Sequence, residues 1–331
     1  MGLVVSVVPS PMVLNPIRGC ILEYAGLSAR CYDVIRSLST SSDDRRYTEA
    51  LTAQCTIPSQ VYQEHCQRLI EFCSKLKLPM KIVGSLSQGT AIPSSCKDCN
   101  DSSDIDILVQ VESITLNPNT PRKDCFANSY SNMAAIPEDA PFSELLGDVQ
   151  VSFSTAKRFL LQRLDEHKGQ YTITPTSSGY VLQNKTTSFV LDVLPAIKID
   201  DNTHLVPHEY AAFCRFVRHQ EVAKFFASLD QHYDGALMYI RFFKVVNRAL
   251  AWGLHSFGIA SACYHVVSKM DKQAWKTFTP KVKFQQIAMA MSKLFKQNGT
   301  LIPRVNAKGN CYFKCDNLSR VFCDLRFLSE L

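Results

Sequence analysis

The sequence lacks any apolar run that approaches the ~20 residues of a membrane-spanning helix, and it has no repeats or low-complexity tracts. Residues 1–13 are apolar, but they have no basic start and contain two prolines, so we do not expect them to be a secretion signal. Residues 1–6 fit the N-myristoylation pattern, yet no basic cluster follows to supply a second anchor. These absences favour a globular protein of the cytoplasm.

Acidic residues are scarce in the second part of the chain. The first 200 residues contain slightly more acidic than basic side chains, whereas residues 201–331 contain twice as many basic as acidic ones, and the net charge is +6. This excess suits a polyanionic partner, such as nucleotide phosphates or nucleic acid, although a lysine-rich solvated surface has the same composition. At 46% hydrophobic and 20% charged residues, the chain of 331 residues suits one large or two small domains.

Cysteine, in contrast, is abundant: there are 13, an odd number, scattered mostly inside apolar stretches. Without a secretion signal, these residues are expected to be free thiols in a reducing compartment. Two pairs, Cys96 with Cys99 and Cys311 with Cys315, have a spacing that could bind zinc. Neither pair has a second half nearby in the sequence, so a structural zinc site is left as an alternative.

Hydrophobic periodicity and turn residues divide the chain into two lobes. We expect helices over 13–38 and 58–78, strands over 80–85 and 104–111, an irregular segment over 113–141, a helix-rich region over 143–167 and short strands over 171–199. From about residue 207, helical periodicity dominates. The predicted fold class is therefore α/β (α+β), with N-terminal helices and a mixed twisted sheet in residues 1–206 and a helical C-terminal lobe in residues 207–331. The cleft between two such lobes is a natural ligand site.

Three carboxylates occupy positions where they are costly unless something positive compensates them. Asp104 and Asp106 share one face of a strand, because strand side chains alternate with period two, and Ile105 and Ile107 share the other. Asp192 lies alone inside the apolar strand sequence SFVLDVLPAIKI. If the two strands are neighbours, the three carboxylates converge and could hold two divalent cations. A solvated strand edge is the alternative.

The sequence between these acids and the preceding strand suits phosphate binding. Gly84 lets the backbone approach a triphosphate closely. The Ser85 hydroxyl and nearby N–H groups can bond to phosphate oxygens, particularly at the start of a helix, and Gly89 and Thr90 could continue that cradle.

The sequence YIRFFKVVNRAL predicts a helix with one basic face. Arg241, Lys244 and Arg248 recur at i, i+3 and i+7, while the aromatic and aliphatic residues lie elsewhere around the helix and can form core. A one-sided basic stripe suits phosphates, although the solvated edge of an amphipathic helix has the same pattern.

Together these motifs resemble the nucleotidyltransferase superfamily that includes DNA polymerase β. More narrowly, residues 58–330 resemble the branch that holds cyclic GMP–AMP synthase, its animal receptor relatives and the 2′-5′-oligoadenylate synthases. VGSLSQGTAI followed by SDIDILV is similar to the Gly-Ser and Asp-x-Asp pattern of that branch. LDVLPAI looks like the strand of the third acid, and its Leu-Pro-Ala is especially close to the oligoadenylate synthases.

The resemblance implies a bilobal nucleotidyltransferase core with its active site in the cleft. It implies two Mg²⁺ or Mn²⁺ ions, and catalytic and metal-binding roles for Asp104, Asp106 and Asp192. Nucleotide binding is assigned by the same resemblance to Gly84, Ser85, Arg215, Lys244 and Tyr264.

Three of these assignments rest on motifs in the helical lobe. IRFFK looks like the helix whose basic residue reaches the donor triphosphate, which nominates Lys244. IASACYHVV resembles a Ser-Tyr-His segment in which the tyrosine, here Tyr264, stacks on a base. Cys263 stands where a phosphate-binding serine is usual, with Ser261 two residues earlier. FCRFVRHQE is similar to a Trp-Arg segment, which implies that Arg215 contacts a base or phosphate.

The resemblance also implies a product and an activator. Cyclic GMP–AMP synthase has a His/Cys zinc insertion that grips DNA before the basic helix, but residues 220–238 here contain His232 and no cysteine. That absence leaves double-stranded RNA or another ligand as the activator. RNA is favoured over DNA, and the stripe of Lys269, Lys272 and Lys276 is one place where its backbone could dock. The predicted function is synthesis of a cyclic dinucleotide messenger from ATP and/or GTP in innate immune sensing. The alternatives are a template-independent nucleotidyltransferase of oligoadenylate type and a catalytically silent, nucleotide- or protein-binding member of the fold.

Overall fold

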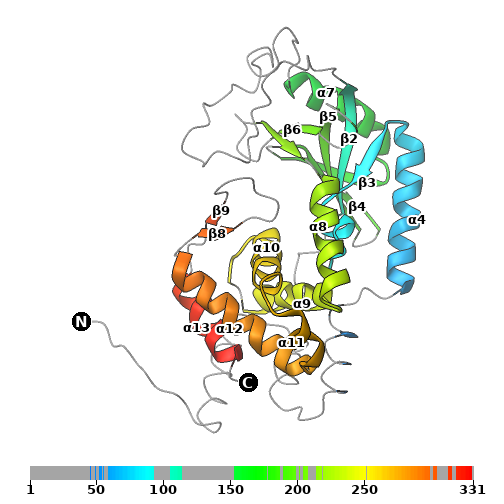
Figure 1. The fold of residues 1–331 in the computed structure, drawn as a ribbon. Helices are drawn as coiled ribbons and strands as arrows, with labels where there is room; N and C mark the ends of the chain where they lie inside the picture. Colours follow the sequence, from blue (N-terminus) through cyan, green and yellow to red (C-terminus); the bar gives the residue numbers. More distant parts are fainter. Residues whose placement is uncertain are drawn as a thin grey trace.

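The structure, a computed structural model, is shown in Figure 1. It describes residues 45, 49, 52–53, 55, 59–92, 105–113, 153–176, 178–186, 189–198, 201, 204–207, 214–217, 219–250, 252–298, 301–303, 312–314 and 318–329. These residues form a lobe built on a sheet and a lobe built of helices. Among them, no helix combines the length and the apolar character that crossing a membrane requires.

The first lobe is built on a mixed sheet. Its strands are β1 (Met80–Ile82), β2 (Ile105–Ser113), β3 (Tyr171–Pro175), β4 (Tyr180–Asn184), β5 (Val190–Lys198), β6 (His204–Pro207) and β7 (Cys214–Val217). Their order in space is β1-β2-β5-β4-β3, while β6 pairs with the end of β5 and β7 pairs with β6. Strands β2 and β5 run parallel, and the other described pairs of this sheet are antiparallel. The predicted α/β (α+β) class with a mixed sheet is confirmed.

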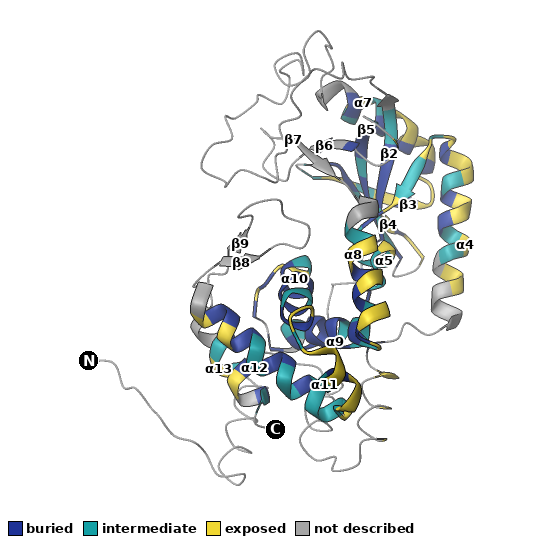
Figure 2. Cartoon of the chain, in the orientation of Figure 1, coloured by how far each residue is buried: buried dark blue, intermediate teal, exposed yellow. Residues whose placement is uncertain are grey.

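One face of this sheet is apolar and buried under helices. The covering helices are α4 (Ser59–Leu76) and α7 (Phe153–Leu164), and the 3₁₀ turn η1 (Asp165–His167) follows α7. Alternation along β2 and β5 puts Ile105, Ile107, Val109, Leu191 and Val193 on the covered face, where all five are buried (Figure 2). Full burial of such a side chain contributes roughly 1.5–3 kcal/mol, so this face is a main source of the stability of the lobe.

The opposite face of the sheet contains both described acids of the predicted triad. Because alternate residues point to opposite faces, Asp106 and Asp192 lie away from the apolar core. A small buried cluster covers this face farther along the strands, formed by Val83, Leu108, Ala196 and Val206. The acids therefore stand beside the covered part of the face, where solvent still reaches them.

The second lobe is helical. Its elements are α8 (His219–His232), α9 (Ala236–Ala249), α10 (Ser256–Val267), α11 (Lys272–Thr277), α12 (Pro280–Asn298), the hairpin of β8 (Leu301–Pro303) and β9 (Tyr312–Lys314), and α13 (Leu318–Ser329). Helix α10 is apolar around most of its circumference and contacts α8, α9, α12 and β8, which explains its central place. The core around it is rich in aromatic rings, among them Tyr239, Phe242, Phe243, Trp252, Trp275 and Phe284.

The N-terminal part of the described chain contacts the helical lobe before it reaches the sheet. Cys55 is fully buried in the core of the helical lobe. The Thr52 Oγ1 atom lies 3.7 Å from the Sδ atom of Met238 on α9. Helix α4 follows and packs on the sheet, so this segment links the two lobes in addition to the connection through α8.

The predicted elements agree with the described ones except at particular places. The strand predicted over 80–85 ends at Ile82, and the short helix α5 (Gly84–Ser87) begins after one intervening residue, Val83. The helical expectation is wrong for residues 214–217, which pair with β6 as strand β7, and for the hairpin β8–β9. The boundary proposed between residues 206 and 207 falls within β6. The helix predicted over 13–38 lies outside the described residues.

Candidate active site

Asp106 and Asp192 lie side by side on the solvent-reached part of the sheet. Strands β2 and β5 are parallel, and their register pairs Asp106 directly with Asp192. Neighbouring strands are about 4.8 Å apart, so the two side chains, which point to the same face, are near enough to ligate a common cation. Both residues are half-buried. The structure thus brings together two of the three acids that the sequence singled out.

Gly84 is required by the close approach of the chain to Asp106. It begins α5 with a φ angle of +64°, in the left-handed region that glycine adopts without strain. A β-carbon at this position would overlap the Asp106 carboxylate and lie 2.6 Å from its Cγ atom. The preceding Val83 N–H also donates to the Asp106 carbonyl oxygen at 2.9 Å. The turn therefore lies against the acidic end of β2, with room for nothing larger than hydrogen.

The residues after Gly84 form a compact hydrogen-bonded turn. Ser85 is the second residue of α5, and its hydroxyl has no hydrogen-bond partner among the described residues. The expected continuation of a phosphate cradle into Gly89 and Thr90 is not seen. Their N–H groups instead donate to the carbonyls of Leu86 at 3.2 Å and Ser85 at 2.9 Å, and Thr90 is fully buried.

Two positively charged side chains of α9 reach this turn from the helical lobe. The Lys244 Nζ atom donates to the Thr90 carbonyl oxygen at 2.7 Å, and the Arg241 Nε–H donates to the Gly89 carbonyl oxygen, also at 2.7 Å. Lys244 is only 5% exposed, although it is charged. The basic face predicted for this helix therefore meets the sheet lobe through these two members and is not simply a solvated edge.

The surroundings of Lys244 change its proton affinity. Its pKa is lowered to about 8, mainly by burial and in addition by the nearby charge of Arg248. The Asp106 carboxylate acts in the opposite direction and favours the charged amine. Lys244 and Asp106 therefore interact electrostatically across the two lobes, at the same turn that Gly84 begins.

Comparison with known proteins bears on this fold. No model of a protein family matches the sequence, and no curated protein matches it. Among solved structures, the STING-associated CdnE c-di-GMP synthase from Capnocytophaga granulosa matches with a TM-score of 0.56 at 14% identity, over 95% of this chain and 96% of that chain. The corresponding synthase from Flavobacteriaceae sp. matches with a TM-score of 0.56 at 15% identity, over 89% and 86%. CdnC from E. coli MS115-1, solved with ATP, matches with a TM-score of 0.55 at 13% identity, over 88% and 91%.

The chain has the fold of these synthases. Since the matches cover most of each chain, the shared fold includes both the sheet lobe and the helical lobe. The two-lobed fold that the resemblance implied is thereby confirmed.

Tyr264 lies on α10 and is held from the side by α8. Its ring meets Phe225 edge-on at a centroid distance of 6.2 Å and an interplanar angle of 84°, and Phe226 at 5.7 Å and 75°. Burial raises the pKa of its phenol, although the residue remains half-buried. Such edge-on contacts hold the ring in place, and the stacking role suggested by the sequence stays a prediction.

The neighbouring Cys263 is a core residue. It is fully buried, and its Sγ atom lies 3.4 Å from the Sδ atom of Met291. Burial in this apolar setting raises the pKa of the thiol. Ser261 is also fully buried. Both side chains lie in the core, so neither is placed to make the phosphate contact that the resemblance assigns to a serine at the position of Cys263.

Several predicted residues fall outside what the structure describes. Asp104 and all four cysteines of the candidate zinc pairs lie in undescribed segments, and Arg215 is described only through its backbone, as part of β7. Within the described ranges, no group of three or more His, Cys, Asp or Glu side chains gathers to hold a metal ion. The described cysteines are free thiols: Cys55, Cys66, Cys73, Cys263 and Cys323.

Sequence reasoning missed the contact that joins the lobes at this site. The helical spacing placed Arg241 and Lys244 on one face, but their acceptors are main-chain carbonyls of residues 89 and 90. Every residue has such a carbonyl, so no side-chain pattern could have identified them. The sign of this contact in the sequence is Gly89 itself, because its φ angle of +68° is one that favours glycine.

The buried Lys244 amine predicts a specific pH dependence of stability. Its pKa is about 8 in the folded protein against the usual 10.5, so between these pH values the unfolded chain binds a proton that the folded chain does not. The free energy of unfolding should therefore rise with pH over this window. Below pH 8 the amine is charged in both states, and its burial is then a constant cost.

We expect the difference in unfolding free energy between wild type and Lys244→Met to move by ~2 kcal/mol in favour of wild type from pH 7.5 to 9.5. Urea titrations at several pH values measure this difference, in which the titration of other groups cancels. Lys293→Met, at an exposed position on α12, is the control and should give a difference independent of pH. A constant difference for Lys244→Met would show that the amine is not held in a low-dielectric site.

Proposed function

We propose that this protein is a metal-dependent nucleotidyltransferase that joins NTPs into a cyclic dinucleotide and releases pyrophosphate. One observation carries the proposal: the register places Asp106 directly beside Asp192 on parallel strands, with the Gly84 backbone against the Asp106 carboxylate. Two carboxylates facing each other beside a glycine turn are costly in a purely structural role, and they suit a site for a polyphosphate and its cations. The likeness in fold to cyclic dinucleotide synthases supports the choice of product.

The residues at this site fit divalent cations. Mg²⁺ and Mn²⁺ prefer carboxylate oxygens, and the paired side chains of Asp106 and Asp192 offer them on one face of the sheet. Asp104, two residues before Asp106, is the proposed third ligand. When bound, two such cations would offset the charge of the triphosphate and make the attacking ribose hydroxyl more acidic.

The side chains around the acids suit an in-line attack of a ribose hydroxyl on the α-phosphorus of an NTP. In this proposal an oxygen of Asp192 accepts the proton of the attacking hydroxyl. The Ser85 hydroxyl donates to a phosphate oxygen. Lys244, which uses one N–H for the Thr90 carbonyl, has two further donors for the triphosphate. Tyr264 stacks on a base, and Arg215 contacts a base or phosphate.

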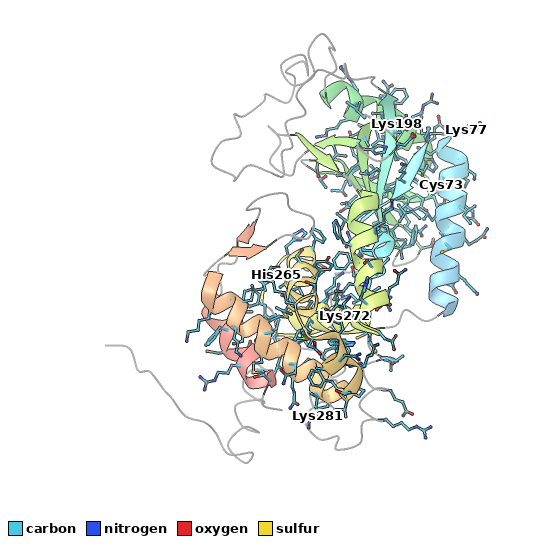
Figure 3. All side chains as sticks on the ribbon, viewed as in Figure 1. Cys73, Lys77, Lys198, His265, Lys272 and Lys281 are labelled. Carbon is cyan, nitrogen blue, oxygen red and sulfur yellow. The ribbon has the colours of Figure 1, made fainter. Side chains whose placement is uncertain are left out.

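We further propose that double-stranded RNA activates the enzyme, as part of innate immune sensing. The proposed docking place is the α11 basic surface, defined as Lys269, Lys272 and Lys276. All three side chains are exposed, and Figure 3 shows Lys272 in the helical lobe. The segment has a firm base, because the Tyr233 hydroxyl shares its single O–H between the carbonyl oxygens of Met270 at 2.8 Å and Ser268 at 3.2 Å. A net positive charge on a fixed segment suits a phosphate backbone, and the acid within the segment, Asp271, caps the start of α11.

Replacing all three lysines of the α11 basic surface by alanine should weaken RNA binding uniformly across sequences. If each lysine contacts a phosphate, the slope of log K against log salt should become less steep by ~2–3. Fluorescence anisotropy with a long RNA duplex at several salt concentrations measures both quantities. Lys293 and Lys296, which are exposed on α12, provide the control when replaced together. Equal affinity and an equal slope would exclude this surface as the docking place.

The direct test of the proposed function is identification of the product. The purified protein is incubated with all four NTPs and Mg²⁺ or Mn²⁺, with and without long double-stranded RNA or DNA, and the products are analysed by mass spectrometry. A cyclic dinucleotide that forms only with RNA supports the whole proposal and names the bases. Linear 2′-5′-oligoadenylate would assign the chain to the oligoadenylate type. Nucleotide binding without any product would favour a catalytically silent role.

A further inference from the structure

The contact between α9 and the turn after α5 has a geometry that suggests a role for Arg241. Arg241 and Lys244 donate to two successive carbonyls, those of Gly89 and Thr90, each at 2.7 Å. The Arg241 guanidinium uses its Nε–H for this bond. A hydrogen bond from a charged donor to a neutral acceptor is stronger than the average hydrogen bond in proteins, so the pair holds the turn firmly against the helical lobe.

The turn that they hold is rigid because it is closed by its own hydrogen bonds. The Gln88 N–H donates to the Gly84 carbonyl at 3.2 Å, the Gly89 N–H to Leu86 at 3.2 Å, and the Thr90 N–H to Ser85 at 2.9 Å. Residues 84–90 therefore move together, and a displacement at the Gly89 carbonyl is passed on to Gly84 and Ser85. Gly84 in turn has no free space beside the Asp106 carboxylate.

The approach of the turn to α9 is also sterically tight. A β-carbon on Gly89 would lie 3.2 Å from the Cδ1 atom of Leu237 and 3.9 Å from the Nη2 atom of Arg241. Helix α9 is itself held at its start, because the Leu237 N–H donates to Oδ1 of Asp230 at 3.0 Å. The Tyr239 hydroxyl adds a bond to the Pro280 carbonyl at 3.1 Å. The position of the turn is thus set by α9 through two hydrogen bonds, and Arg241 donates one of them.

We propose that Arg241 is a positioning residue of the active site. It binds the Gly89 carbonyl and so fixes α5, which sets Gly84 against Asp106 and aims Ser85 at the phosphate, while its own guanidinium touches no substrate. This inference rests on the proposed function, in that the turn it positions is the proposed phosphate-binding turn. It differs from the role proposed for Lys244, which both holds the turn and contacts the triphosphate.

The test compares Arg241→Met, which keeps an unbranched side chain and removes the donor, with Arg241→Lys, which can restore a single N–H bond. Without nucleotide, hydrogen exchange of the amides in residues 86–92 should be ~10-fold or more faster in Arg241→Met and near wild type in Arg241→Lys. With NTPs, kcat of Arg241→Met should fall ~10–100-fold while KM changes little, and Arg241→Lys should recover most of it. Lys293→Met, on the exposed side of α12, should leave all of these values unchanged.

The readouts separate this inference from the proposed function. Wild-type exchange in Arg241→Met overturns the positioning role, whatever the enzyme makes. A raised KM with unchanged kcat also overturns it, because Arg241 would then bind substrate directly. If the wild-type protein forms no product, the proposed function fails, and exchange alone decides whether Arg241 holds the turn. If Arg241→Met does not fold, exchange and kinetics of Arg241→Lys against Lys293→Met decide: exchange less than ~3-fold faster and kcat less than ~3-fold lower than wild type support a restored bond.

Discussion

Asp106→Asn is expected to lower kcat for nucleotidyl transfer by ~10³-fold or more while the protein remains folded. Asparagine has nearly the same shape, so the packing of β2 on β5 is kept, but a negatively charged oxygen beside Asp192 is lost. In the proposed mechanism that oxygen binds the cations, and the cations offset the negative charge of the transition state. The free energy of unfolding should change little, because the substitution removes both the repulsion between two like charges in register and the attraction between Asp106 and the Lys244 amine. Initial rates and thermal unfolding measure the two effects.

Asp165→Asn is the matched control for this change. Asp165 is exposed in η1, which follows α7 on the face of the sheet opposite the acids, and it forms an ion pair with Lys168 at 2.9 Å. It should keep wild-type kcat. Combining Asp106→Asn with Asp104→Asn should leave no measurable turnover. A single variant that retained more than a tenth of the wild-type rate would show that Asp106 is not a catalytic residue.

Gly84→Ala is the second change with a large expected effect. The new β-carbon would overlap the Asp106 carboxylate, and the left-handed φ of +64° would in addition be strained for alanine. Either Asp106 or α5 must move, so kcat should fall ~100-fold or more, and the free energy of unfolding should drop by ~2–3 kcal/mol. Kinetic assays and urea unfolding measure these losses.

Gly235→Ala separates the two causes. Gly235 also has a left-handed φ, +75°, but a β-carbon there meets no atom within 4 Å among those described. It should cost only the backbone strain of ~1–2 kcal/mol and keep its kcat. If Gly84→Ala behaved like Gly235→Ala in both assays, the close approach of the turn to Asp106 would have no role in the reaction.

The sheet and its acids could be predicted from the sequence, because apolar and polar residues alternate along a strand with period two. Ile105 and Ile107 alternate with Asp106, and the structure buries the first two and leaves the third half-exposed. The expectation that Asp192 lies near Asp106 needed only the adjacency of two strands. Its parallel register was beyond a sequence argument, since it is set by the packing of the whole lobe.

Other features could not be predicted, because they depend on residues far apart in the chain. The bond from Arg241 to Gly89 joins positions separated by 152 residues, and the burial of Lys244 follows from that docking. Strand β7 was misassigned because four residues are too few for periodicity to distinguish a strand from a helical turn, whereas pairing with β6 decides it. The core position of Cys263 required the neighbouring Met291 of α12.

The burial of Cys55 in the helical lobe has a consequence for the order of folding during synthesis. This residue emerges from the ribosome long before its partners in the helical core, such as Ile240 and Trp275, have been made. Thr52 meets Met238 across a separation of 186 residues. The helical lobe therefore cannot complete its core as an autonomous C-terminal fragment. Cys55 can be buried only after the helices of that lobe have been synthesised. Such non-local closure slows folding, so refolding of the whole chain should be slower than the local helical contacts alone would suggest.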